Sequence, residues 1–250
     1  MYNPLSLEGK TILVTGASSG IGKGIAIECS KMGAKLVITA RNSKRLNDTY
    51  LELEGDSHIQ IVADLTIEED FELLIENSPK LDGLVNNAGI PTLTLVKFIK
   101  KDNLNEIINI NTIAPILLTS SLVKKKKINK GASIVFISSV SGVCISAIGE
   151  SPYSASKGAI HGFVMGAALD LASQRIRVNS INPGLIETSI LEMASEMFSR
   201  EQLNEKLKLY PLKRIGQPID VALGAVYLLS DASSWVTGTN IVIDGGFTLP

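Results

Sequence analysis

The residues in this chain best suited to proton transfer are Tyr153 and Lys157, which lie four positions apart. Ser151 is a favourable helix N-cap and Pro152 suits the first helical position, so we predict a helix that begins just before Tyr153. A spacing of four places the phenol and the ammonium on one helix face. A free phenol titrates at about 10, and an adjacent cation lowers that pKa because it stabilises the phenolate. The pair therefore predicts a tyrosine that exchanges protons, although the same spacing also arises by chance.

A glycine-rich turn near the N-terminus, Thr15–Gly22, is the second candidate for chemistry. The apolar run Thr11–Val14 before it predicts a buried strand, and Gly22–Met32 after it predicts a helix. Strand, glycine-rich turn and helix form the context of a dinucleotide-binding site, whose helix N-terminus attracts phosphate oxygens. A surface turn without a ligand is the alternative.

Each glycine of this turn has a steric reason. Gly16 permits a tight bend, Gly20 lets the backbone approach a pyrophosphate, and Gly22 allows the helix to pack closely on the strand. The residues predicted to bind the cofactor here are Gly16, Ser18, Ser19, Gly20, Ile21 and Gly22.

Short β-rich runs alternate with longer helical stretches along the chain. The predicted strands are Thr11–Val14, Leu36–Ala40, Ile59–Val62, Gly83–Val85, Ser133–Ile137, Arg177–Ile181 and Asn240–Ile243. The predicted helices are Gly22–Met32, Lys44–Leu53, Ile67–Glu76, Asp102–Lys126, Tyr153–Ser173 and Asp220–Leu229. This alternation predicts an α/β fold, a doubly wound Rossmann-type parallel sheet of about seven strands with helices on both faces. We expect a single domain over residues 1–250.

The composition argues against several classes of function, namely binding to nucleic acid, insertion into a membrane and binding of a metal. The 250 residues include 24 basic and 25 acidic side chains, so no global field favours nucleic acid or an anionic membrane. No leader and no run of 18 apolar residues is present, so we expect neither a signal peptide nor a membrane span. The two cysteines, Cys29 and Cys144, lack metal-ligand spacing, and no metal is expected. A cytoplasmic enzyme is the expectation.

Together these features resemble the short-chain dehydrogenase/reductase family over nearly the whole chain. The motifs that carry the resemblance are the turn Thr15–Gly22, the segments Asn86–Gly89, Pro183–Gly184 and Asp244–Gly246, and the four residues Asn111, Ser139, Tyr153 and Lys157, which match the family's catalytic tetrad.

The resemblance implies a role for each member of the tetrad. Tyr153 is the acid that protonates a carbonyl oxygen as hydride reaches the carbon. Lys157 lowers the pKa of Tyr153 and hydrogen-bonds the nicotinamide ribose. Ser139 donates to the substrate oxygen, and Asn111 holds a water that links Lys157 to solvent.

The assignment of Ser139 has two competitors, Ser138 and Ser141. Ser139 lies 14 residues before Tyr153, one more than the family pattern leads us to expect. We place the added residue in the loop Val143–Glu150 and predict that this loop lines the mouth of the substrate site; a plain connector is the alternative.

The end of the second predicted strand indicates which cofactor is used. Ala40 stands where the family's NAD-preferring members carry an acid, and Arg41 follows it. An arginine fork binds a 2′-phosphate that a carboxylate would repel, so NADP(H) is predicted over NAD(H); a solvated arginine is the alternative. Asp64 and Leu65 resemble the segment at the adenine, although Asp64 and Thr66 could also serve the start of the next helix.

The other cofactor contacts implied by the resemblance are Asn86, Asn87, Gly89, Tyr153, Lys157, Pro183, Gly184, Ile186 and Thr188. Residues Ser189–Tyr210 are expected to form a helical lid with the apolar side chains Ile190, Leu191, Met193, Met197 and Phe198, which could instead pack on the core. The basic run Lys124–Lys127 is explained by a solvated helix C-terminus.

The leading hypothesis is an NADPH-dependent oxidoreductase that interconverts a ketone and a secondary alcohol, most similar to the 3-oxoacyl-[acyl-carrier-protein] reductases. A dehydrogenase of a sugar, polyol or steroid-like alcohol is the alternative, and an inactive cofactor-binding regulator a third. Docking of an acyl-carrier protein is doubtful, because relatives that dock one carry arginines where this chain has Lys130 and Gln174; Arg175 lies next to the second position.

Self-assembly is also expected. The small residues Gly158, Ala159, Gly162, Gly166, Ala167 and Ala168 are predicted to lie on the outer face of the Tyr153 helix, where they would allow another helix to approach closely. Family members usually pair this helix across a two-fold axis, so we predict a homotetramer with dihedral symmetry.

Overall fold

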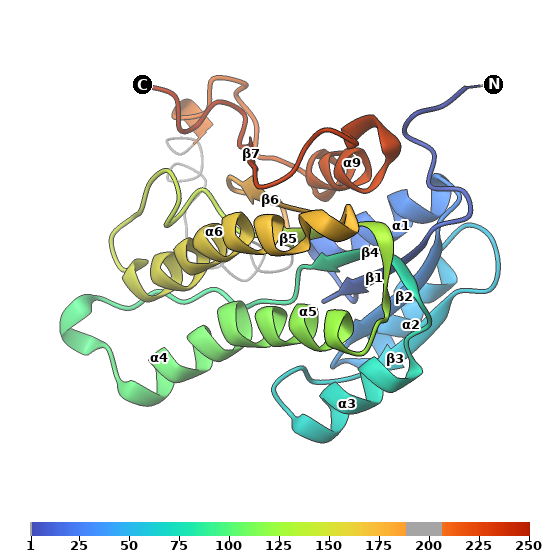
Figure 1. Ribbon diagram of the computed structural model, residues 1–250. Helices are drawn as coiled ribbons and strands as arrows, with labels where there is room; N and C mark the ends of the chain where they lie inside the picture. The colour runs from blue at the N-terminus through green and yellow to red at the C-terminus, as the bar shows by residue number, and fades with distance from the viewer. Residues whose placement is uncertain (1, 189–206) are drawn as a thin grey trace.

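A seven-stranded, wholly parallel sheet forms the centre of the computed structural model, which describes residues 2–188 and 207–250 (Figure 1). Its strands are β1 (Thr11–Thr15), β2 (Lys35–Ala40), β3 (Ile59–Val62), β4 (Leu81–Asn86), β5 (Ile128–Ile137), β6 (Arg177–Pro183) and β7 (Asn240–Ile243). The spatial order is β3-β2-β1-β4-β5-β6-β7, so the direction of winding reverses between β1 and β4. A crevice opens beyond the carboxyl ends of strands at such a reversal. The predicted fold class is confirmed.

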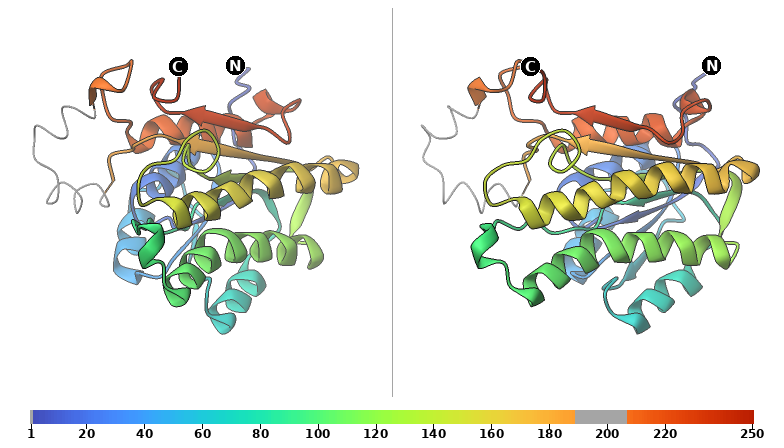
Figure 2. Two further views of the ribbon diagram at one scale, coloured as in Figure 1. Left: turned by 90° about the vertical axis from the view of Figure 1, so that its left-hand side faces the viewer. Right: turned by 60° about the vertical axis from the view of Figure 1, so that its left-hand side comes forward.

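Helices cover both faces of the sheet (Figures 1 and 2). They are α1 (Gly20–Lys31), α2 (Ser43–Leu51), α3 (Glu68–Asn77), α4 (Lys101–Ile108), α5 (Ala114–Lys124), α6 (Ser151–Leu171) and α9 (Pro218–Leu229), with short 3₁₀ turns at Val96–Phe98, Ala172–Gln174 and Asp231–Ser233. Helices α1, α2 and α9 share one buried apolar cluster with the sheet, while α3, α5 and α6 share the other. The strands are therefore apolar on both sides, as continuous apolar runs predicted.

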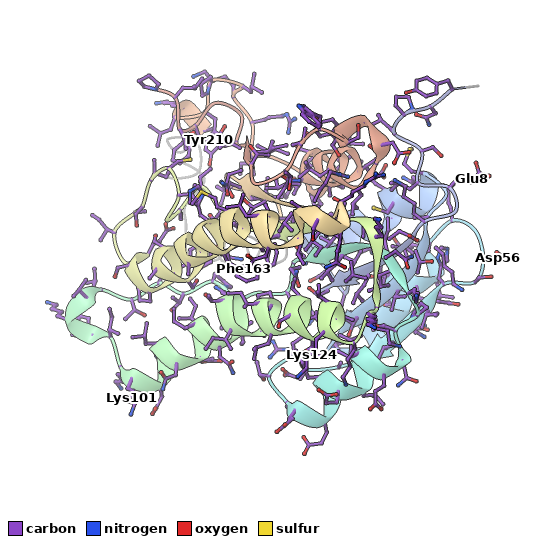
Figure 3. The ribbon with its side chains drawn as sticks, viewed as in Figure 1. Glu8, Asp56, Lys101, Lys124, Phe163 and Tyr210 are labelled. Carbon is purple, nitrogen blue, oxygen red and sulfur yellow. The ribbon has the colours of Figure 1, made fainter. Side chains whose placement is uncertain are left out.

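Two aromatic pairs join segments that lie apart in the sequence. Phe163 of α6, labelled in Figure 3, meets Phe136 of β5 edge to face with ring centroids 5.6 Å apart. Tyr210, also labelled there, stacks on Phe247 at 4.7 Å and accepts a hydrogen bond from the Leu185 N–H. The second pair attaches the chain after β6 to the C-terminal segment, beside the cavity described below.

Several predicted boundaries are wrong, for local reasons. The helix predicted over Asp102–Lys126 is interrupted by a π turn at Asn109–Ile113, a widening that is common at functional sites. Helix α6 includes Ser151 as its first residue and is preceded by Glu150, so the predicted N-cap is displaced by one position. Strand β5 begins at Ile128, which pairs with Leu81 ahead of a β-bulge.

The stretch Lys101–Lys124 is the one helical segment in the described part of the chain that is long and apolar enough to span a membrane, with a mean hydropathy of 1.4. Packing on the sheet accounts for much of that apolarity, because Leu118 and Leu122 are fully buried in the core. Part of the opposite face is also apolar, since Ile113 and Leu117 are exposed.

Candidate active site

A cavity of about 430 Å³ lies at the carboxyl ends of the central strands, where the winding reverses. The predicted residues on its wall are Gly16, Ser18, Ser19, Gly20, Ile21, Arg41, Asp64, Leu65, Asn87, Gly89, Ser139, Tyr153, Lys157, Pro183, Gly184, Ile186 and Thr188. Three predicted residues, Gly22, Asn86 and Asn111, are not on the wall, and each contacts a segment that positions wall residues. The predicted lid residues 189–206 lie outside the described residues.

The glycine-rich turn is built so that only glycine fits at two positions. Gly16 has φ +65°, and a Cβ there would approach Ala88 Cα to 2.9 Å. A Cβ at Gly22 would lie 2.3 Å from the carbonyl oxygen of Gly16. Asn87 ties the turn to β4 because its Nδ2 donates to the Thr15 carbonyl at 3.0 Å. Gly22 therefore allows the turn to pack closely, although Gly22 itself is not on the cavity wall.

The start of α1 suits a pyrophosphate. Ser19 precedes the helix without capping it by a side-chain hydrogen bond, and the first turn contains no acidic residue. The N–H groups and positive dipole end of this 12-residue helix thus remain uncompensated where Ser19, Gly20 and Ile21 line the cavity. At the adenosine end, the hydroxyl of Thr39 is buried on the same wall without a hydrogen-bond partner. These groups fit a phosphorylated dinucleotide.

The three serines at the end of β5 have different partners. Ser138 Oγ donates to the carbonyl of Lys157 at 3.0 Å, and Ser141 Oγ donates to Glu150 Oε2 at 2.7 Å. Ser139 lies on the cavity wall with Tyr153, and its hydroxyl lowers the pKa of Tyr153. Ser138 also lines the wall, but its hydroxyl donates to the Lys157 carbonyl, so of the three hydroxyls only that of Ser139 affects the pKa of Tyr153. The catalytic role of Ser139 stays a prediction.

Tyr153 and Lys157 both reach the cavity, but their electrostatic relation differs from the expectation. Burial raises the pKa of Tyr153, hydrogen bonding from Ser139 opposes this rise, and the charge of Glu150 adds to it. Lys157 Nζ donates to the Ile137 carbonyl at 2.9 Å, and burial lowers the pKa of Lys157 to about 8. The pKa of Tyr153 is therefore raised overall, because desolvation dominates the phenol, and the lowering expected from Lys157 stays a prediction.

Asn111 supports the site from inside the π turn. Its Oδ1 accepts from the Ile90 N–H at 2.8 Å, and its Nδ2 donates to the Ile90 carbonyl at 2.9 Å and to Ser156 Oγ at 3.0 Å. The side-chain amide thus fixes the loop after β4 against α6. The predicted water-holding role of Asn111 stays a prediction. Asn86 is likewise buried behind the wall, where its Nδ2 donates to Thr119 Oγ1.

At the opposite end, two arginines reach the cavity. Arg41 Nη1 lies 3.4 Å from Asp64 Oδ2, and Arg45, which the sequence analysis missed, also lines the wall. The signal for Arg45 was the Asn42 N-cap, because it places Arg45 in the first turn of α2. Thr66 donates to Asp64 Oδ1 instead of capping α3, whose N-cap is Ile67, so the alternative helix-start role for Thr66 is wrong.

No group of three or more His, Cys, Asp and Glu side chains that could hold a metal ion occurs within residues 2–188 and 207–250. The basic run has structural partners: Lys125 pairs with Glu72, and Lys127 Nζ donates to the carbonyls of Glu76 and Ser78.

The doubly wound sheet, the glycine-rich turn and the tyrosine and lysine on one cavity define a nicotinamide-dependent oxidoreductase of the Rossmann type. A family model described as enoyl-(acyl carrier protein) reductase matches residues 16–248. The 3-oxoacyl-[acyl-carrier-protein] reductase of Rickettsia felis is 35% identical over 98% of this chain and 99% of its own. The reductase of that name from Thermotoga maritima is 36% identical over 98% of this chain and 100% of its own.

A solved variant of a Serratia marcescens short-chain dehydrogenase/reductase superposes with a TM-score of 0.89 at 27% identity, covering 98% of this chain and 100% of that one. The protein belongs to the short-chain dehydrogenase/reductase family and is an NAD(P)-dependent oxidoreductase.

Proposed function

We propose that the protein reduces a ketone to a secondary alcohol with NADPH, acting as a 3-oxoacyl-thioester-type reductase. The observation that carries this proposal is one continuous cavity, with arginines at its adenosine end and Ser139 and Tyr153 at the other. Its relatives named 3-oxoacyl-[acyl-carrier-protein] reductase support the choice of substrate class.

The residues at the end of the cavity that contains Tyr153 transfer the proton. The bound nicotinamide supplies the hydride that the carbonyl carbon receives. Tyr153 gives its hydroxyl proton to the carbonyl oxygen, which leaves an alcohol and a phenolate. Ser139 accepts the Ser141 N–H at 3.1 Å, and its one hydroxyl hydrogen turns from Tyr153 to the substrate oxygen when the ketone binds between them. Lys157, whose pKa of about 8 keeps it mostly protonated at pH 7, stabilises the phenolate from one helical turn away.

The preference for NADPH rests on the charges at the end of β2. Arg41 and Arg45 meet the N-terminus of α2, which has no acidic residue in its first turn. The only carboxylate on the described part of the cavity wall is Asp64. The ion pair between Arg41 and Asp64 is long and largely solvated, with 62% of the Arg41 side chain exposed, so it holds Arg41 weakly. A 2′-phosphate would be the better partner for the guanidinium.

Arg41→Ala is expected to weaken NADPH binding by roughly 10–100-fold, because a charge-assisted hydrogen bond contributes about 1.5–3 kcal/mol. NADH binding should hardly change, since it has no 2′-phosphate. Titration of both cofactors by fluorescence measures this, with Arg175→Ala, an exposed arginine beyond the end of α6, as control. A wild-type protein that prefers NADH would refute the proposal.

The substrate is tested by initial rates with NADPH and a panel of 3-oxoacyl thioesters, diketones and oxidised sugars. A 3-oxoacyl thioester should be the best substrate; a sugar or polyol that outperforms it would favour the alternative activity. No reduction of any ketone would favour an inactive cofactor-binding protein. Because Gln174 replaces one of the expected cations, a carrier-bound thioester should be reduced about as well as a short thioester, at low and high salt alike.

We further propose a homotetramer, because exposed apolar or small residues lie on two separate parts of the described surface, which we call the first and second patches. The first, on α5 and α6, which lie side by side in Figures 1 and 2, consists of Ile113, Leu117, Gly162, Met165, Gly166 and Leu169. The second, around α9 and the sheet edge, consists of Ile219, Leu223, Trp235 and Val242.

The first patch differs in part from the predicted face of α6. A Cβ at Gly158 would meet the Gly142 carbonyl oxygen at 2.8 Å, so Gly158 faces inward, and Ala167 and Ala168 are buried. The helix twist brings Met165 and Leu169 to the outer face in their place. Two patches satisfy the requirement of a dihedral tetramer for more than one kind of interface.

The double variant Leu117→Glu, Leu169→Glu is expected to split the tetramer, because charges would be buried in an apolar interface. Light scattering should give four times the 26.7 kDa chain mass for wild type and a smaller assembly for the variant. Leu51→Glu, at an exposed position outside both patches, is the control. A monomeric wild type at micromolar concentration would contradict the prediction.

A further inference from the structure

A half-buried carboxylate, Glu150, lies beside the proposed acid and has no part in the mechanism above. It occupies the N-cap position of α6, three residues before Tyr153. Its Oε2 accepts from Ser141 Oγ at 2.7 Å, and the Ser141 N–H donates to Ser139 Oγ at 3.1 Å. Two hydrogen bonds therefore connect the Glu150 carboxylate through Ser141 to Ser139, which lines the cavity together with Tyr153.

The backbone holds Glu150 in this place from both sides. Its N–H donates to the Ala147 carbonyl at 3.1 Å, and its carbonyl accepts from the Ser154 N–H at 2.7 Å. The preceding residue, Gly149, accepts from the Thr94 N–H at 2.7 Å, which joins this loop to the loop after β4. These hydrogen bonds fix the backbone around Glu150, and the Glu150 side chain extends from it to Ser141. The carboxylate therefore has a defined position.

The Glu150 carboxylate has no cationic partner in the described part of the chain. On the described cavity wall, the charged groups are Arg41, Arg45 and Asp64 at the adenosine end and Lys157 at the tyrosine end. Lys157 is occupied by the Ile137 carbonyl.

We propose that the Glu150 carboxylate suits the site to reduction at neutral pH and to ketones that carry no negative charge next to the carbonyl. The proposal rests on the proposed ketone reductase activity and adds a selectivity to it. Reduction requires the protonated phenol, whereas oxidation of an alcohol requires the phenolate to accept the hydroxyl proton. A fixed negative charge beside the phenol disfavours the phenolate. The same charge repels a substrate carboxylate that binds beside Ser139 and Tyr153, since like charges interact unfavourably.

Glu150→Gln tests this role because it removes the charge and keeps an oxygen that can accept from Ser141. The pH midpoint for alcohol oxidation should fall by about 0.5–1 pH unit, so the kcat for oxidation at pH 7 should rise relative to the kcat for reduction. Ser141→Ala, which removes the hydrogen bond but retains the charge, should move the midpoint much less. An unchanged midpoint in Glu150→Gln, or an equal shift in both variants, would overturn the proposal.

A second measurement needs no variant. Wild type should reduce methyl 3-oxobutanoate with a kcat/KM about 10-fold or more above that for the 3-oxobutanoate ion, and Glu150→Gln should narrow this ratio. Equal values in wild type would overturn the selectivity. A wild type that reduces neither compound nor any ketone of the panel would instead refute the proposed function, so the two failures are distinguishable.

Discussion

Tyr153→Phe is expected to lower turnover by at least about 10²–10⁴-fold, the range that general acid–base catalysis contributes. The substitution keeps the ring that packs in the wall of the cavity and removes only the proton donor. NADPH binding should change little, because the phosphate and adenosine contacts lie elsewhere on the wall. Steady-state reduction rates and cofactor titration together separate the loss of chemistry from a loss of binding.

A matched control is available in Tyr50→Phe. The Tyr50 hydroxyl donates to the His58 carbonyl at 3.3 Å and is absent from the cavity wall, so its removal should leave turnover intact. Retained turnover in Tyr153→Phe would reject the whole tetrad assignment, including the roles of Ser139 and Lys157.

Lys157→Met is expected to abolish reduction and, unusually for a core substitution, to stabilise the protein at neutral pH. Burial lowers the pKa of Lys157 from 10.5 to about 8, so the unfolded chain binds this proton more tightly than the folded one. Below pH 8 the folded state carries the full penalty, equivalent to about 3 kcal/mol. Between pH 8 and 10.5 the penalty disappears, and wild-type stability from this residue rises with pH.

Methionine removes the charge and fills most of the space, but it leaves the Ile137 carbonyl without its donor, which costs about 1–3 kcal/mol. We therefore expect a net gain of about 0–2 kcal/mol in the free energy of unfolding at pH 7, and no gain at pH 10. Urea unfolding of both proteins at the two pH values measures this. A variant that is less stable than wild type at pH 7, or whose gain grows toward pH 10, would contradict the assignment of Lys157 as a buried, costly cation.

A stability penalty at this position would have a functional meaning. A lysine that lies one turn from the proposed acid and is buried on the cavity wall has no structural need for its charge. Retention of a destabilising group at a reactive site is a common compromise between stability and activity.

Local sequence patterns were sufficient to predict the architecture of the fold. The alternation of short apolar runs with helical stretches depends on hydrophobic periodicity, which each segment carries by itself, and it predicted the parallel sheet. The glycines of the first turn were equally readable, because the steric demand at Gly16 and Gly22 excludes any side chain. The spacing of Tyr153 and Lys157 brought both to one cavity, since helix geometry alone sets which residues share a face.

Only the tertiary structure distinguished between groups of the same type and set their electrostatics. Ser138, Ser139 and Ser141 are chemically identical in the sequence, and the packing of β5 against α6 decides which one meets Tyr153. The direction in which the Tyr153 pKa shifts, and the effect of the Glu150 charge on it, likewise depend on burial and on electrostatic interactions through space. Desolvation and long-range contacts sum over residues far apart in the chain, so spacing cannot encode them, whereas strand, turn and helix are encoded locally.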